Sequence, residues 1–245
     1  MQSTMSSLLT IFLLVLYCIF YRQDFAFYVM IRSLPGGYIL CVMFTCIRSF
    51  FQPRLKHVTD DSEISFRIWF CDIDNYGHMN NASYNLYCDY GRYNLAVRLF
   101  GWRWFGKGYC VVGASNIQYL RPLKLFQKMT IRTRIVAANG KNVWFRQSME
   151  CNGKVHAVAM MKMVFLNAKF QSVVGKESLS EILGEEEVNK DWKGDIYAAP
   201  HYEALGERYM TLNDGILDSL EAEYKDKGER MQVHSSRVKK ECSVC

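Results

Sequence analysis

The segment at residues 82–100 constrains the fold most, because it predicts one long helix among runs that read as strands. It contains no proline and repeats large residues, with one glycine, at helical spacing. These positions are Tyr84, Tyr87, Cys88, Gly91, Leu95 and Leu99. Ahead of it, residues 63–71 alternate, which predicts a strand with one buried face. The side chains on that face are Ile64, Phe66, Ile68 and Phe70.

Four further runs after the helix alternate in the same way, at residues 109–119, 128–138, 143–151 and 154–167. Arg121-Pro122 ends the first run, because proline cannot continue a central ladder. Asn139-Gly140 and Asn152-Gly153 predict tight hairpin turns, since both residues tolerate the positive φ that such turns require. One strand, one long helix and then an antiparallel meander predict an α+β fold.

The loop between the first strand and the helix, residues 72–84, concentrates chemically active side chains. It reads Asp-Ile-Asp-Asn-Tyr-Gly-His-Met-Asn-Asn-Ala-Ser-Tyr. Asn80 and Asn81 stand where a helix N-cap is expected. Strand alternation predicts that Asp72 and Asp74 share one side of the chain. A carboxylate near the amide donors of a helix N-terminus suits attack on a carbonyl and stabilisation of the resulting oxyanion.

This motif, followed by a helix that carries Asp89-Tyr90-Gly91-Arg92, resembles the hotdog-fold acyl-CoA thioesterases. With its apolar N-terminus, the chain is most similar to thioesterase superfamily member 6 and its relatives. The resemblance covers residues 52–169 well and the N-terminal segment loosely. It implies an antiparallel sheet wrapped round the long helix, and a homodimer through the edges of two sheets. It also implies an acyl-CoA or other acyl thioester as substrate, with no cofactor. The alternative is a non-catalytic hotdog protein that binds acyl lipids or scaffolds lipid-metabolic enzymes.

Within this resemblance, Asp74 is the expected catalytic carboxylate, as a general base toward water or as a nucleophile on the thioester. Asp72 is the competing candidate. Asp89 is the reserve, because some hotdog enzymes use a carboxylate on the helix. An i,i+3 ion pair with Arg92 is the structural alternative for Asp89.

His78 is expected either to assist proton transfer or to tie the loop to the helix. Asn81 either caps the helix or polarises the substrate carbonyl. Ser83 stands where the family usually carries arginine. We assign substrate contacts to Gly77, Met79 and Tyr84. The aromatic residues that would line an acyl tunnel, or else pack in the core, are Tyr84, Tyr87, Trp102 and Trp104.

The N-terminal residues predict association with a membrane. Residues 5–21 are apolar and nearly uncharged, and they lack the basic start and small-residue cleavage site of a signal peptide. Residues 25–51 are broken at Leu34-Pro35-Gly36-Gly37, which favours an interfacial amphipathic segment over a second span or an ordinary core helix pair. The first basic residues all follow the apolar run, so we expect an endoplasmic reticulum anchor with the main domain cytosolic.

Composition sets further limits. The net charge of +6 is spread without a basic stripe, so we expect no nucleic-acid partner. Nine cysteines without regular spacing predict free thiols, and the single Cys-x-x-Cys, Cys242 to Cys245, predicts no metal site. The same ending has a Cys-a-a-X form, which makes Cys242 a candidate for prenylation. We predict a membrane segment at residues 1–51, a hotdog domain at 52–170 and a polar extension at 171–245.

Overall fold

The computed structural model describes residues 10, 32, 34–101, 109–167, 169–183, 196, 197, 215, 218 and 219. The chain divides into two units, Met1–Ala199 and Pro200–Cys245. Every helix and strand named below lies in the first unit, and residues 215, 218 and 219 of the second are helical. The predictions for residues 5–21, apart from residue 10, and for Trp102, Trp104 and Cys242 lie outside the described residues.

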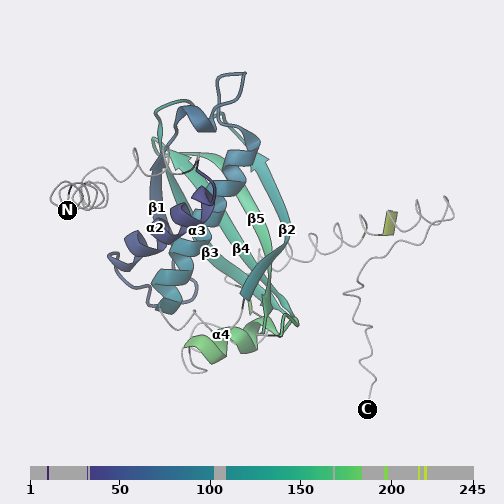
Figure 1. Cartoon of the computed structure of the whole chain (residues 1–245). Coiled ribbons are helices and arrows are strands. Elements are labelled where there is room, and N and C mark those ends of the chain that lie inside the picture. The colour runs from purple at the N-terminus through teal and green to yellow at the C-terminus, as the bar shows by residue number, and fades with distance from the viewer. Residues whose placement is uncertain are drawn as a thin grey trace, which may run out of the picture. The chain divides into compact units, whose positions relative to one another are not determined.

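The strands form one antiparallel sheet in the order β1-β3-β4-β5-β2 (Figure 1). Their bounds are Ser62–Arg67 for β1, Tyr109–Tyr119 for β2, Lys128–Asn139 for β3, Asn142–Cys151 for β4 and Lys154–Leu166 for β5. A two-residue strand, β6 (Ile196–Tyr197), also pairs with β3. The four predicted strands after the helix are confirmed, each to within one residue at either end.

The two hairpin turns differ from each other in geometry. Asn152 and Gly153 take φ values of 50° and 70°, as predicted for a turn in which both central residues are left-handed. The other turn lies one residue later than predicted, because Asn139 pairs with Asn142 across it. Its central residues are therefore Gly140, with a φ of 53°, and Lys141.

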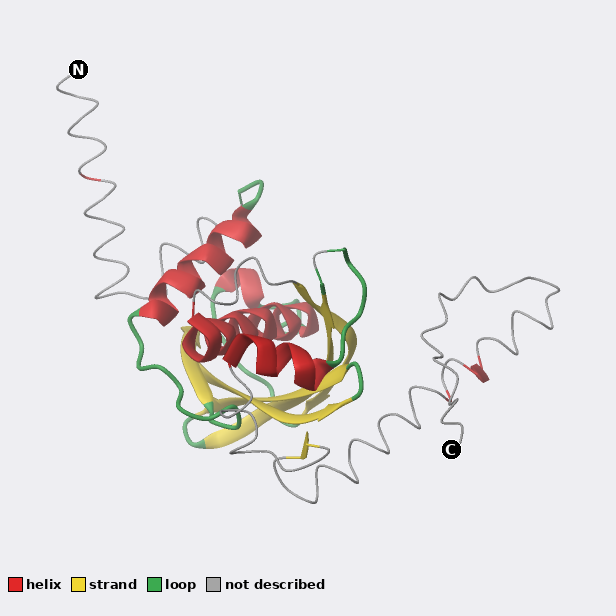
Figure 2. Ribbon diagram, turned by 90° about the horizontal axis from the view of Figure 1, so that it is seen from below, coloured by secondary structure: helices red, strands yellow, loops and turns green. Residues whose placement is uncertain are grey.

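The long helix α3 (Asn81–Phe100) lies in the concave face of the sheet, which curves round it (Figure 2). All six positions predicted to face the core are buried. At Gly91 the helix lies close to the sheet, since a Cβ there would lie 2.7 Å from Thr133 Oγ1. The α+β class and the sheet wrapped round a helix are therefore confirmed.

Helix α2 (Gly37–Phe50) covers the opposite side of α3 and is amphipathic. It begins after Gly36, whose φ of 75° suits the predicted break in the chain. Cys41 and Phe44 join the core, and Asn94 of α3 donates a hydrogen bond to Ser49 Oγ at 2.8 Å. The other face of α2 exposes large apolar side chains, namely Tyr38, Ile39, Leu40, Met43 and Ile47. Within the described part of the chain, no helix is both long and apolar enough to cross a membrane.

A short helix that the sequence analysis missed, α4 (Gly175–Leu183), packs against β3, β4 and β5. Its Leu179 and Ile182 join the core and Leu183 packs against it, but three apolar residues in a polar stretch are a weak periodic signal. The domain boundaries at residues 51 and 170 remain predictions. Helix α2, which precedes the first boundary, packs against α3, and helix α4, which follows the second boundary, packs against the sheet.

Candidate active site

The first strand ends earlier than predicted, and this sets the course of the loop. After Arg67 the chain leaves the sheet and forms a 3-10 turn, η2 (Phe70–Asp72). Ile68 is buried, whereas Phe70, predicted on the same face, is 68% exposed. The strand alternation that predicted a shared side for Asp72 and Asp74 therefore does not extend to them, and the two carboxylates lie in different surroundings.

Asp72 is fully buried, and its carboxylate is bound by three donors. Its Oδ2 accepts hydrogen bonds from the Trp69 N–H at 2.9 Å and the Tyr87 hydroxyl at 2.8 Å. Its Oδ1 forms an ion pair with Arg32. Burial, with the charge of Asp72 adding to it, raises the pKa of Tyr87 well above its usual value, so the phenol remains a donor. These contacts make Asp72 an anchor for the loop rather than a group open to substrate.

Asp74 closes a tight turn that places its carboxylate beside His78. The Gly77 N–H donates to the Asp74 carbonyl at 3.1 Å, and the Tyr76 N–H donates to Asp74 Oδ1 at 2.9 Å. Gly77 has a φ of +77°, so its role here is conformational. Asp74 Oδ2 lies 3.3 Å from His78 Nδ1, with 19% of the Asp74 side chain and 42% of the His78 side chain exposed. Two of the predicted catalytic residues are thus in contact.

The two asparagines at the start of α3 occupy different positions in the helix cap. Asn80 is the N-cap, and its side chain accepts a hydrogen bond from the Ala82 N–H at 2.8 Å. The Asn80 N–H also donates to the Asp72 carbonyl at 2.7 Å, which ties the helix start to η2. Asn81 is the first residue of α3 and is exposed. The capping role left open for Asn81 therefore belongs to Asn80.

A pocket of about 220 Å³ opens beside this loop. Its lining combines the loop and the first turn of α3 with the end of β2 and the residues that follow it. The lining residues are His78, Met79, Asn81, Tyr84, Tyr119, Leu120, Arg121 and Pro122. Burial raises the pKa of Tyr84, and the negative charge of Asp74 acts in the same direction. Four of the six predicted site residues line this pocket. Asp74 contacts the lining residue His78 but does not itself line the pocket, and neither does Gly77.

The second contribution to this pocket, residues 119–122, was missed as a site. The only sequence signal there was Arg121-Pro122, which marked the end of a strand. Tyr119 packs edge-on against Tyr84, with ring centroids 4.9 Å apart. A strand that is distant in sequence therefore supplies one wall, and only its packing against α3 shows this.

A second, largely apolar pocket of about 250 Å³ lies between the later turns of α3 and the start of β2. Arg92 pairs with Asp89, as predicted for i,i+3 residues, and also donates to Gln147 at 3.1 Å. Most of the remaining lining is apolar or aromatic: Tyr93, Ala96, Phe100, Tyr109, Cys110, Val111, Val112, Phe145 and Met163. Tyr87, proposed for an acyl tunnel, instead packs in the core against Phe66.

The chain is similar to several known proteins. A family model described as the thioesterase-like superfamily matches residues 68–182. Protein THEM6 of Danio rerio is 30% identical over 141 residues, which cover 56% of this chain and 70% of that protein. Long-chain acyl-CoA thioesterase FadM of Escherichia coli K12 is 29% identical over 109 residues, covering 43% of this chain and 83% of FadM. The solved structure of YbaW from Escherichia coli is 24% identical, covers 51% of this chain and 98% of that chain, and gives a TM-score of 0.47.

Proposed function

Since the chain belongs to the thioesterase-like superfamily, with the THEM6 proteins among its relatives, we propose that it is an acyl-CoA thioesterase. It would hydrolyse fatty acyl-CoA to a free fatty acid and CoA. The observation that carries the proposal is the contact between Asp74 and His78 on a loop at the N-terminus of α3, beside an open pocket. The name of the relative FadM, a long-chain acyl-CoA thioesterase, supports the same substrate class.

In the general-base route, the Asp74 carboxylate accepts a proton from water as the water oxygen attacks the thioester carbonyl carbon. The oxyanion that forms is stabilised by donors at the start of α3, for which the Asn81 side-chain amide is our candidate. The C–S bond then breaks, and the proton held by Asp74 passes to the CoA thiolate. In the nucleophilic route, the Asp74 carboxylate attacks the carbonyl carbon, the C–S bond breaks and CoA leaves as the thiolate. Water then hydrolyses the mixed anhydride, which regenerates the Asp74 carboxylate, and the fatty acid proton passes to the thiolate.

His78 supports either route from the same position. Its Nδ1 faces Asp74 at 3.3 Å, which leaves Nε2 for water or substrate in the pocket. The apolar pocket between α3 and β2 is our candidate for the acyl chain, because its walls offer few polar groups to an extended hydrocarbon.

The test is hydrolysis of acyl-CoAs of increasing chain length by the full chain and by Asp74→Asn. We expect turnover to fall by ~100-fold or more, the usual scale for losing an acid–base group. The matched control is Asp61→Asn, because Asp61 pairs with Arg134 on β3 and lies outside the loop. Wild-type turnover in Asp74→Asn together with its loss in Asp72→Asn or Asp89→Asn would show that the site is misassigned. Absence of hydrolysis with lipid co-purifying would favour a binding protein.

We also propose that the protein is attached to a membrane, as an endoplasmic reticulum protein with a cytosolic main domain. The exposed apolar face of α2 and the apolar sequence of residues 5–21 both support membrane contact. Ile39 and Met43 on that face are 61% and 55% exposed. The test is carbonate extraction of microsomes, followed by protease protection of a C-terminal tag. Release of the protein by carbonate would contradict the membrane anchor. A tag that is protected from protease would contradict the cytosolic orientation of the main domain.

We further propose a homodimer through the edge of the sheet. Strand β2 ends the strand order, so among the residues that the structure describes one of its sides has no neighbouring strand. Val111 and Val112 on this strand are each 43% exposed, and an open edge of this kind favours pairing with a second copy. Light scattering of the purified full chain measures the oligomeric state, and a monomer at micromolar concentration would contradict this proposal.

A further inference from the structure

Arg32, which precedes α2, contacts both ends of the loop that carries Asp74 and His78. Its Nη1 pairs with Asp72 Oδ1 at the end of η2. Its Nη2 donates to the Ser83 hydroxyl at 3.5 Å, in the first turn of α3. One guanidinium group therefore bridges the residue before the loop and the helix after it.

The ion pair meets a physical requirement of the buried Asp72. A carboxylate that is 0% exposed is strongly unfavourable unless a cation and hydrogen bonds compensate its charge. Its other donors, the Trp69 N–H and the Tyr87 hydroxyl, are neutral. In the described part of the chain, Arg32 is the one cation paired with Asp72. Burial alone lowers the pKa of Arg32, but the hydrogen bond and charge of Asp72 outweigh it and raise the pKa, so the guanidinium stays charged.

The planar fork of arginine explains why this residue suits the position. A guanidinium has several donors in a fixed plane and can bind two acceptors at once, whereas the ammonium of lysine is a single point charge. Here the two acceptors lie on separate elements, η2 and α3. The Asn80 N–H to Asp72 carbonyl bond, at 2.7 Å, joins the same two elements through the backbone.

We propose that Arg32 is a positioning residue, which clamps the two ends of the loop at residues 73–80 and so fixes where Asp74 and His78 stand. Its effect on turnover rests on the proposed thioesterase function. The segment before α2 thereby contributes to the active site, although 40 positions separate Arg32 from Asp72. A purely charge-compensating Arg32 would be replaceable by lysine, and a clamping Arg32 would not.

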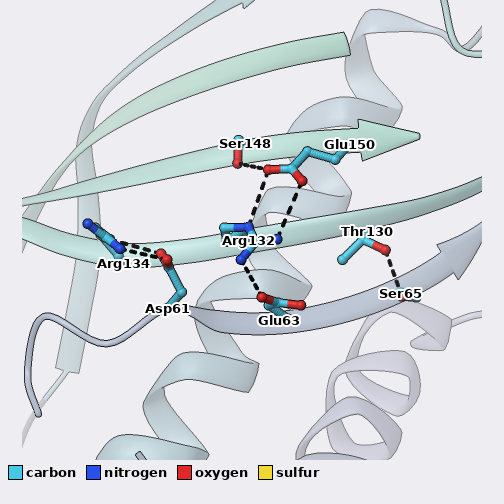
Figure 3. A network of polar contacts seen from close by, with 8 residues as sticks. All are labelled: Asp61, Glu63, Ser65, Thr130, Arg132, Arg134, Ser148 and Glu150. Carbon is cyan, nitrogen blue, oxygen red and sulfur yellow. Dashed lines mark hydrogen bonds and ion pairs between the residues drawn. The ribbon is translucent and has the colours of Figure 1, made fainter. Parts of the chain in front are cut away.

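The test compares full-length Arg32→Lys with a matched control, Arg134→Lys. Arg134 on β3 binds Asp61, the residue just before β1, through two hydrogen bonds of 2.8 and 2.6 Å (Figure 3), and its side chain is similarly exposed. We expect Arg32→Lys to retain the wild-type unfolding midpoint but to lower kcat by ~10-fold with little change in KM, since small displacements of catalytic groups cost up to about 100-fold. We expect Arg134→Lys to leave kcat unchanged.

Hydrogen exchange of the amides of residues 73–80 gives a readout that does not depend on activity. We expect faster exchange in Arg32→Lys at this loop alone, with β3 and β4 unchanged. Wild-type kcat together with wild-type loop exchange in Arg32→Lys would overturn the proposal, as would uniformly faster exchange across the sheet. If the wild-type protein hydrolyses no acyl-CoA, the proposed function fails, and the exchange data still decide the role of Arg32.

A double variant covers the case in which Arg32→Lys does not fold. Arg32→Met with Asp72→Asn removes both charges together, so no unpaired charge is left buried. We expect this protein to fold, with faster loop exchange and kcat lowered by ~100-fold. Loop exchange and kcat equal to wild type in the double variant would overturn the proposal.

Discussion

Gly91→Ala tests how closely α3 approaches the sheet, and we expect it to destabilise the protein by ~3 kcal/mol. The new Cβ would lie 2.7 Å from Thr133 Oγ1, 2.8 Å from Gln147 Nε2 and 3.0 Å from Ile131 Cγ2. Two of these atoms are hydrogen-bonded to each other, since Gln147 Nε2 donates to Thr133 Oγ1 at 2.9 Å. The same Nε2 donates to the Cys88 carbonyl at 2.9 Å.

The magnitude follows from three contributions. Inserting a methyl group into a packed core costs about 1–3 kcal/mol. Displacing the buried Gln147 amide from its acceptors costs about 1–3 kcal/mol. Alanine in place of glycine in a helix interior stabilises the folded protein by about 1 kcal/mol. The net loss of free energy of unfolding is therefore about 1–5 kcal/mol, centred on ~3 kcal/mol.

Urea denaturation of the full chain, followed by tryptophan fluorescence, measures this loss. The matched control is Gly113→Ala on β2, where the new Cβ would have Val164 Cγ2 as its nearest neighbour, at 3.3 Å, on an exposed surface. We expect the control to change stability by less than about 0.5 kcal/mol. A Gly91→Ala protein with the wild-type midpoint would refute the close contact between α3 and strands β3 and β4.

Asn80→Ala removes the N-cap of α3, and we expect a loss of ~1 kcal/mol in unfolding free energy, measured by the same titration. Burial raises the pKa of Cys88 from 9.0 to about 12, so iodoacetamide at pH 8.5 should leave it unmodified while the exposed Cys71 reacts, as peptide mass spectrometry would show. Because the folded-state pKa of Cys88 is raised, its contribution to stability is present below pH 9 and is lost as the pH rises toward 12.

The strands and the long helix followed from the sequence because periodicity directly records which side chains are buried. The alternation at residues 109–119 gave the bounds of β2, and the helical spacing at residues 82–100 identified the buried side of α3. Phe70 was misplaced because strand alternation was continued past Arg67, where the chain turns into η2. Periodicity over a few residues does not mark where a strand stops.

Within the candidate site, the sequence predicts spatial contact only between residues that are close in the chain. Asp74 and His78 lie four positions apart, and a glycine between them permits the turn that joins them. Asn80 and Asn81 were both possible caps, and only the backbone geometry at the start of α3 selected Asn80.

By itself, the sequence determined the α+β class, the strand-helix-meander order and the loop that carries Asp74 and His78, because each depends on local patterning. The tertiary structure alone decided that Asp72 is a buried anchor, that Arg32 clamps the loop and that Tyr119 forms a pocket wall. No local pattern specifies a partner 40 residues away; that partner is selected when packing of the chain removes Asp72 from water and its charge must be compensated.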